Sequence, residues 1–366
     1  MERNLLIRRM AEIQTGFFTH EIQLRRLDEL GDPLKAVDEA VDFEMFRPLL
    51  DTLLGPRTTG PGRPPWDRVR MFKILVLQLV RGLSDEKLEF DLIDSASAQR
   101  FAGLSPHDKV PDSRTVWLFR DTLAKAKLPG GGDAGGTDGV HALFELFHRE
   151  LAVKGLLCRE GKTVDAMIVE VPRQRNPKEE NKQIKNGEVP ADWRKQPRKL
   201  AQKDTDARWT LKRGRAYYGY KNSIVGGNGD GFIHGYVVAP ANAHDSKIIP
   251  DCYFEAAGDG TAAYGDSAYT HKDIAARLAR AGIESRIHEQ RLAGQELSEG
   301  QKESNRVKSK VRARIEHRFG RMRMCLKGLQ VRSIGLERCR ATIGMLNLVH
   351  NLMEYTRLRP RHAAVA

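Results

Sequence analysis

The chain has 366 residues, of which 40% are hydrophobic, and it carries a formal net charge of +13. A field of this sign favours a polyanionic partner, with nucleic acid ahead of an acidic membrane surface, because it concentrates phosphate-bearing molecules and repels other cationic proteins. No apolar run approaches the roughly 20 residues that cross a bilayer, and charges interrupt the first residues too often for a signal peptide. The sequence therefore predicts a cytoplasmic protein with no membrane partner.

Residues 1–128 predict a helical N-terminal region. Apolar side chains recur at helical spacing between Trp66 and Val80, directly after a breaker rich in proline and glycine. Further helices are expected to begin at Ser84 and at Asp112 or Ser113, which are residue types that cap helices. Short helices joined by tight polar turns are typical of helix-turn-helix arrays, so DNA binding is one interpretation and a plain helical bundle is the other.

Residues 129–139 are so rich in glycine that they predict a linker, because such a segment cannot pack a core and has many backbone states. A domain boundary is therefore expected there, with a second domain over residues 140–357. Within that domain, residues 172–206 form an insert rich in Lys, Arg, Glu, Asn and Gln. Its few apolar residues predict a solvated loop that becomes ordered beside a polyanion.

The second domain predicts strands mixed with helices. Strands are expected at 162–171, 218–225, 232–239, 262–265 and 284–287, and helices at 141–156, 246–257, 271–281 and around Glu316. Antiparallel hairpins come first and crossovers follow, which is the order of the ribonuclease H-like fold. The predicted fold class is thus mixed α/β (α+β), with a helical DNA-binding region followed by a ribonuclease H-like mixed-sheet catalytic domain.

Three carboxylates stand out in this arrangement. Asp165 lies inside a strand, where aspartate is disfavoured without a partner or a metal, Asp266 closes a short strand, and Glu316 flanks the apolar stripe of a strongly basic helix. Because the cysteines are scattered without zinc-binding spacing, any metal ion would need oxygen ligands. Phosphodiester cleavage by two metal ions requires such hard ligands, whereas lysine and arginine can hold DNA but not the metal.

Each carboxylate also has a simpler interpretation. Glu316 has the spacing of an i,i+4 ion-pair partner for Arg312, and Asp266 is placed to cap a turn or the next helix. Asp204 and Asp206 are expected to belong to a loop and not to the metal site. In the stretch from His244 to Ser246, a helix cap at Asp245 is favoured over a catalytic dyad. Trp193 and Trp209 are open to a core role or to stacking on a base.

Seven short stretches follow one another along the chain in a recognisable order. They are Gly62-Arg-Pro-Pro-Trp66, Thr163-Val-Asp165, Asp204-Thr-Asp-Ala-Arg-Trp209, Tyr218-Gly-Tyr-Lys-Asn222, Pro240-Ala-Asn-Ala-His-Asp-Ser246, Tyr264-Gly-Asp-Ser-Ala-Tyr269 and Val311-Arg-Ala-Arg-Ile-Glu-His-Arg-Phe-Gly320. Together they resemble the DDE transposases of bacterial insertion sequences, specifically insertion-sequence family five, over most of the chain. Arg312 and Arg323 fit the family's signature around the glutamate, whereas Ser309 stands where the family usually has a tyrosine.

The resemblance implies a site and its cofactor. Asp165, Asp266 and Glu316 would be the catalytic triad and the metal ligands, holding two Mg²⁺ ions for which Mn²⁺ can substitute, and no nucleotide cofactor would take part. The residues expected to contact DNA are Arg63, Arg114, Lys221, Lys308, Lys310, Arg312, Arg314, Arg318 and Arg323.

The predicted function is that of an insertion-sequence DNA transposase. Its partners would be the double-stranded DNA of the element ends, recognised as terminal inverted repeats, and the target DNA, to which the freed 3′-hydroxyl ends are joined. A homodimer or higher oligomer is expected on DNA, with the cytoplasmic protein associated with the bacterial nucleoid when bound. Two alternatives stay open, namely a catalytically silent DNA-binding repressor with the same fold and a ribonuclease H-like nuclease without strand transfer.

Overall fold

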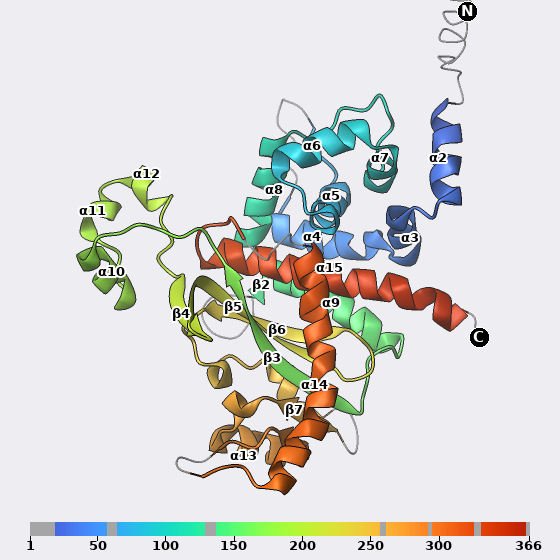
Figure 1. Ribbon diagram of the computed structural model, residues 1–366. Coiled ribbons are helices and arrows are strands. Elements are labelled where there is room, and N and C mark those ends of the chain that lie inside the picture. Colours follow the sequence, from blue (N-terminus) through green and yellow to red (C-terminus); the bar gives the residue numbers. More distant parts are fainter. Residues whose placement is uncertain are drawn as a thin grey trace, which may run out of the picture.

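The computed structural model describes residues 19–56, 64–128, 137–256, 261–291, 295–325 and 331–363. Helices of the N-terminal region lie on one side of the long helix α15 (Leu336–Ala363), and a twisted mixed sheet lies on the other (Figure 1). The predicted fold class, a helical region followed by a mixed sheet, is confirmed. No helix in the described ranges is both long enough and apolar enough to cross a membrane.

In the described part of the N-terminal region, short helices joined by loops extend from Thr19 to Lys125. Its elements are α2 (Thr19–Glu29), α3 (Pro33–Ala40), the 3₁₀ turn η1 (Phe43–Phe46), α4 (Arg47–Leu54), α5 (Arg68–Arg81), α6 (Asp85–Asp94), α7 (Ala96–Ala102) and α8 (Ser113–Lys125). The predicted caps are present, because the side chains of Ser84 and Asp112 accept hydrogen bonds from backbone amides in the first turns of α6 and α8. Asp112, and not Ser113, caps α8.

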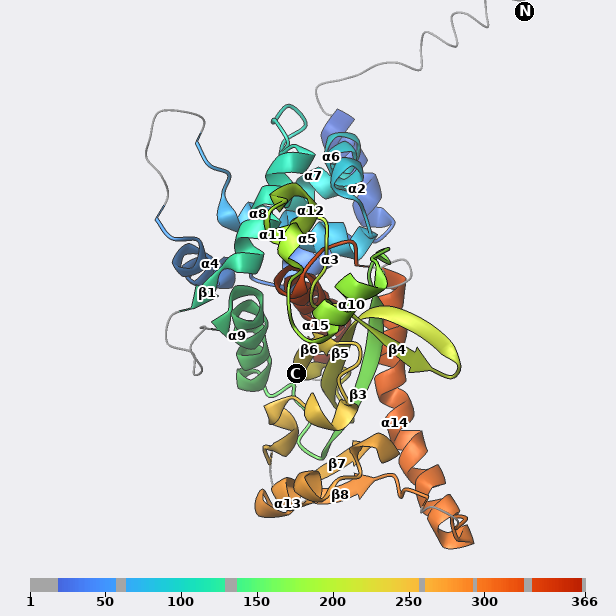
Figure 2. The same ribbon diagram turned by 90° about the vertical axis from the view of Figure 1, so that its left-hand side faces the viewer.

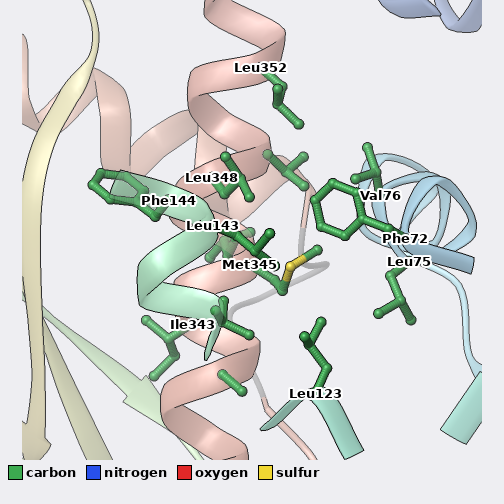
Figure 3. Packing of buried hydrophobic residues seen from close by; sticks show 14 of the residues in the cluster. Phe72, Leu75, Val76, Leu123, Leu143, Phe144, Ile343, Met345, Leu348 and Leu352 are labelled. Carbon is green, nitrogen blue, oxygen red and sulfur yellow. The ribbon is translucent and has the colours of Figure 1, made fainter. Parts of the chain in front are cut away.

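One hydrophobic core joins the N-terminal helices to the sheet. In Figure 3, Phe144 of α9 (Gly139–Val153) and Phe72 of α5 lie on two sides of α15 near Leu348, and Leu123 of α8 lies farther along the same helix. All four side chains are almost fully buried, and each such burial contributes about 1.5–3 kcal/mol. Of the predicted linker, residues 129–136 lie outside the described ranges; the short strands β1 (Lys127–Leu128) and β2 (Thr137–Asp138) pair at its two ends. The helices on both sides of that segment thus share one core.

The central sheet has β3 (Gly161–Glu170) in its middle. β3 pairs antiparallel with β5 (Arg215–Gly227) on one edge and parallel with β7 (Ala262–Gly265) on the other, and β8 (Glu284–Ile287) pairs parallel with β7. On the far edge of β5, β4 (Arg208–Lys212) pairs with residues 215–219 and β6 (Ile233–Pro240) with residues 220–226. The order β6-β5-β3-β7-β8 is that of the predicted ribonuclease H-like sheet; β4 is an addition that the sequence analysis did not predict.

A smaller core covers the opposite face of the sheet. Val164 of β3 packs there with Tyr253, Tyr269 and Leu278, the last from α13 (Lys272–Arg280). The prediction of a helix at 246–257 is wrong. The described part of this stretch contains only the 3₁₀ turns η2 (Asp245–Lys247) and η3 (Asp251–Phe254). A further 3₁₀ turn, η4 (Ser267–Tyr269), follows β7. Pro250 separates η2 from η3, since proline lacks the backbone N–H that a continuous helix would need.

The insert at 172–206 is folded, which corrects the prediction of a solvated loop. Its helices α10 (Lys178–Lys185), α11 (Ala191–Arg194) and α12 (Pro197–Leu200) project away from the sheet (Figure 1). They surround Trp193, which is fully buried and donates a hydrogen bond from Nε1 to Glu180 at 2.8 Å, while the Lys203 ammonium lies 5.2 Å from the centre of its ring. Trp193 is therefore a core residue of the insert.

The long basic helix α14 (Glu299–Cys325) crosses the face of the sheet and contacts β3 and β7 (Figures 1 and 2). Its apolar residues Ile315, Phe319 and Met322 are buried, as their helical spacing predicts. This placement brings the polar flank of α14 next to the middle of the sheet.

Candidate active site

Asp165 and Asp266 lie side by side at the centre of the sheet. In the parallel pairing of β3 with β7, Thr163 is opposite Tyr264, and each aspartate follows two residues later on its own chain segment. Because side chains alternate along a strand, residues two positions beyond a matched pair return to the same face. The register therefore brings the first two predicted catalytic residues together.

Asp266 has a second task in the local backbone. It comes directly after β7, and its Oδ1 accepts a hydrogen bond from the amide of Ala268 at 2.9 Å, so that it caps the turn η4. The capping role that the sequence allowed is thus present. Because this bond fixes the carboxylate against the end of β7, capping positions Asp266 and does not compete with a role in the site.

Asp165 is a partly buried carboxylate with little positive charge close to it. Burial raises the pKa of Asp165 to about 6, although an amide hydrogen bond from Ala166 and the charges of Arg312 and Lys212 lower it, and the negative charge of Asp266 raises it further. Arg312 of α14 makes a loose ion pair with Asp165, with Nη2 3.7 Å from Oδ2, and its Nε is buried without a hydrogen-bond partner among the described residues. The site therefore has room for more positive charge.

Glu316 lies on α14 one helical turn beyond Arg312, on the same flank of the helix. Its side chain is exposed, and Arg312 pairs with Asp165 in place of Glu316, so the simple i,i+4 ion pair is not formed. Among the described residues, no three His, Cys, Asp or Glu side chains lie close enough to hold a metal ion. The structure thus brings two of the three predicted ligands together and leaves the third at the rim.

The donor set nevertheless fits a hard divalent cation. Asp165, Asp266 and Glu316 offer only carboxylate oxygens, which Mg²⁺ and Mn²⁺ prefer over nitrogen or sulfur. The raised pKa of Asp165 reflects the free-energy cost of ionising this carboxyl beside Asp266, and a bound cation would offset that cost. Arg312 is the cation that now neutralises part of this charge.

His288 is a residue of the site that the sequence analysis missed. Gly265 of β7 is opposite Ile287 of β8, so the next residues, Asp266 and His288, lie side by side like the two aspartates. His288 Nε2 is 3.3 Å from the hydroxyl of Ser309 on α14, and burial together with Arg312 and Lys308 lowers the pKa of the imidazole. Only the strand register identifies this position, and the sequence predicted both strands but not their register.

The predicted DNA contacts divide by exposure. Arg114, Lys310, Arg314 and Arg323 are exposed, although Arg314 donates a hydrogen bond to the carbonyl of Asn228. Arg63 lies outside the described residues. Lys308 and Arg312 are partly buried at the site, where Lys308 donates to the carbonyl of Ile287 at 3.1 Å.

Two of the predicted contacts hold the protein together instead. Arg318 is only 4% exposed, donates to the carbonyls of Gly227 and Gly231, and lies 3.5 Å from a carboxylate oxygen of Asp230. The prediction that Arg318 contacts DNA is therefore wrong, because phosphate cannot reach it. Lys221 donates to the carbonyl of Ala243 and to Asp245, each at 2.7 Å, and so anchors the loop after β6.

The remaining polar motifs are also structural. The cap of η2 is His244, whose Nδ1 accepts from the amide of Ser246, so the prediction of a cap at Asp245 is wrong. Asp204 is buried and accepts hydrogen bonds from Tyr220 and from the amide of Gly335 just before α15. As expected, Asp204 lies in a loop, which it ties to β5 and to the start of α15.

Two transposase family models match this chain. A family model described as "Transposase DDE domain" matches residues 157–352, and one described as "Transposase domain (DUF772)" matches residues 22–122. Among solved structures, a cryo-EM structure of the piggyBac transposase synaptic complex with hairpin DNA matches at 12% identity, with 90% of this chain and 76% of that chain covered and a TM-score of 0.40. The Mos1 transposase paired-end complex with left transposon end matches at 10% identity, with 63% and 61% covered and a TM-score of 0.17.

The DDE model covers more than half of the chain and contains all three predicted catalytic carboxylates. Membership of this family implies an enzyme that cleaves and joins DNA strands with the help of a divalent metal ion. The chain belongs to the DDE transposase family.

Proposed function

We propose that this transposase cleaves DNA at the ends of an insertion sequence of family five and joins the freed 3′-hydroxyl ends to target DNA. The observation that carries this proposal is the shared register of Asp165 and Asp266, which places two carboxylates on one face at the middle of the sheet. The third member is Glu316 on α14, the helix that crosses this face.

The three carboxylates would hold two Mg²⁺ ions, or Mn²⁺ in their place. When bound, such ions activate the attacking oxygen and stabilise the leaving oxygen of a phosphodiester. Asp165 and Asp266 fix the position of the charge, because one is built into a strand and the other is tied to the amide of Ala268. Arg312 and Lys308 line the same site and offer positive charge to the phosphate being cut.

The division of labour along the chain follows the predicted domains. We assign the recognition of terminal inverted repeats to the helical region 1–128 and catalysis to residues 140–357, joined by the glycine-rich segment 129–139. The exposed cations Arg114, Lys310 and Arg323 would contact backbone phosphates, together with Arg63. Cutting two ends and joining both to one target requires at least a dimer on the DNA. Because its substrate is DNA, the protein would be associated with the nucleoid when it acts.

The decisive experiment is cleavage of labelled element-end DNA in Mg²⁺ and in Mn²⁺. The protein would be compared with Asp165→Asn, Asp266→Asn and Glu316→Gln, and with Glu303→Gln as the matched control on an exposed turn of the same helix. We expect the three site variants to bind DNA but not to cut it, and the control to cut normally.

Each of the other results points to a different protein. A site variant that cuts like the parent removes that residue from the triad. Binding without cleavage by the parent protein favours the repressor. Cleavage without joining of the cut end to a second DNA favours a nuclease.

A further inference from the structure

The hairpin formed by β4 and the start of β5, residues 208–219, has an unusual tip. Lys212 is opposite Arg215, and the two residues between them, Arg213 and Gly214, both have positive φ angles of 52° and 76°. This is the backbone of a tight two-residue turn, for which asparagine or glycine is the usual choice at both positions. Among the described residues, Arg213 is the one non-glycine residue with positive φ. Backbone strain of this kind concentrates at functional sites.

The tip of the hairpin is entirely cationic. Lys212, Arg213 and Arg215 are exposed, and residues 207–216 contain no acidic side chain. Neither the Lys212 side chain nor the Arg213 side chain makes a hydrogen bond or a close ion pair with another described residue, and the Arg215 guanidinium stacks 5.2 Å from the ring centre of Tyr217. Three cations are thus held near one another on a short turn without local neutralisation.

One face of β4 is exposed and apolar. Trp209 is 48% exposed and Leu211 is 76% exposed, and both side chains point to the same side because they are two residues apart. The Arg173 guanidinium lies 5.4 Å from the ring centre of Trp209. Exposed apolar residues on an edge strand invite non-specific pairing unless something covers them. Together with the cations, they suit a partner that has both phosphates and flat apolar surfaces.

The hairpin extends toward the candidate active site. Lys212 is close enough to Asp165 for its charge to lower the pKa of that carboxyl. In Figure 2 the hairpin curls out on the same side of the sheet as α14, the helix that carries Arg312 and Glu316, and Figure 1 shows that the two are separated along the sheet. Its cationic tip therefore faces the side of the molecule on which the DNA must lie if the carboxylates are to cut it.

We propose that the β4–β5 hairpin is a clamp that grips the DNA backbone next to the phosphate being cut, with Lys212, Arg213 and Arg215 on phosphates and Trp209 and Leu211 on the adjoining sugar and base. This inference rests on the proposed transposase function. It assigns a binding role to a hairpin outside the carboxylate site and outside the predicted DNA contacts.

The test uses the full chain with Arg213→Asn and Lys212→Ala. Asparagine accepts positive φ, so Arg213→Asn removes the charge while it keeps the turn. Arg280→Asn is the matched control, because Arg280 is an exposed arginine on α13 without an assigned DNA role. Thermal unfolding and circular dichroism would verify that all variants fold.

The first measurement is the salt dependence of binding to element-end DNA. Each lost phosphate contact should reduce the slope of log Kd against log salt by about 1. We expect this reduction for Arg213→Asn and for Lys212→Ala, together with at least a tenfold slower single-turnover cleavage, and no change for Arg280→Asn. A hairpin variant that keeps the parent slope and cleavage rate overturns the clamp, as does an equal loss in Arg280→Asn.

The second measurement separates the two DNA sources. Strand transfer of a precut end into an unrelated duplex reports contacts with the target, whereas cleavage of uncut ends reports contacts with the element. A loss in either reaction supports the clamp and identifies the DNA it holds, and no loss in both overturns it. If the parent protein neither binds nor cuts end DNA, the proposed function itself fails. If the parent and the hairpin variants cut end DNA at the same rate, only the clamp fails.

Discussion

Asp165 within β3 and Asp266 directly after the parallel strand β7 each stand two residues beyond the pair Thr163 and Tyr264. Neighbouring carboxylates repel each other when both are ionised, and burial adds to the cost. The folded protein therefore carries a local instability at its candidate active site, which a divalent cation would relieve.

The first prediction concerns Asp165→Asn in the absence of metal. The pKa of Asp165 is raised from its usual 3.8 to about 6, so its contribution to stability is fully present below pH 3.8 and is lost as the pH rises through 6. Above pH 7 the variant should be more stable than the parent by up to about 3 kcal/mol. Thermal unfolding in EDTA at pH 7.5 and at pH 4.5 measures this difference, which should fall to about 1 kcal/mol at the lower pH. Equal stabilisation at both pH values would show that packing, and not charge, is responsible.

The second prediction concerns Arg312 as a competitor of the metal ion. Its guanidinium lies 3.7 Å from the Asp165 carboxylate, a partly buried pair worth on the order of 1 kcal/mol. Arg312→Ala should therefore tighten Mn²⁺ binding to the DNA-free protein several-fold, as measured by electron paramagnetic resonance titration. Arg312→Lys is the control and should lie between the two. Weaker Mn²⁺ binding in Arg312→Ala would mean that the arginine supports the ligand arrangement instead.

The third prediction separates Arg318 from the exposed cations of α14. Its loss would remove the buried cation beside Asp230 and one donor each from the carbonyls of Gly227 and Gly231, which costs about 3–5 kcal/mol. Arg318→Ala should lower the melting temperature strongly, whereas Arg323→Ala should leave it almost unchanged. Arg318→Lys should not restore stability, because an ammonium cannot reproduce the planar fork of donors. A stable Arg318→Ala with weaker DNA binding would reverse this assignment.

The fourth prediction concerns acid stability through His350 of α15. Burial lowers the pKa of this histidine to about 4, and its Nε2 lies 3.1 Å from the carbonyl of Gly231. Its contribution to stability is present above the unfolded pKa of about 6.5 and is lost as the pH falls toward 4, by about 3 kcal/mol. Urea unfolding at pH 7.5 and pH 5 should show this loss in the parent and a smaller one in His350→Asn. An unchanged pH dependence in the variant would assign the loss to other groups, of which His148 is the first candidate because burial also lowers its pKa to about 4.

Alternation and spacing predicted the order of the main strands, and with it the position of Asp165 inside β3 and of Asp266 directly after β7. They did not predict the register, and so His288 was missed although its strand was expected. The spacing of Arg318 along α14 does indicate a buried position. It lies three residues after Ile315 and four before Met322, which puts it on the buried face of α14, but its basic neighbours favoured a DNA contact.

The hairpin and the insert illustrate a different limit. Apolar and polar residues alternate only weakly over residues 208–212. The apolar side chains of Trp209 and Leu211 point to one side of β4 and are exposed, so the alternation predicts the wrong face of this strand as buried. The insert contains a single tryptophan, whose ring is contacted by Glu180 and Lys203, and Ile184 is buried in the same insert. Composition alone does not show such a small core.

The core that α5, α8 and α9 share with α15 has a consequence for how the protein handles its substrate. A helical region joined to the sheet by a flexible tether would sample many positions, and the bond that is cut would vary relative to the sequence that is recognised. Here side chains from both parts pack against one helix. Because close-packed interiors are hard to compress, such a core holds the two parts in a fixed relative position. The shared core would thus fix the number of base pairs between the repeat that the helical region binds and the phosphodiester bond that is cleaved.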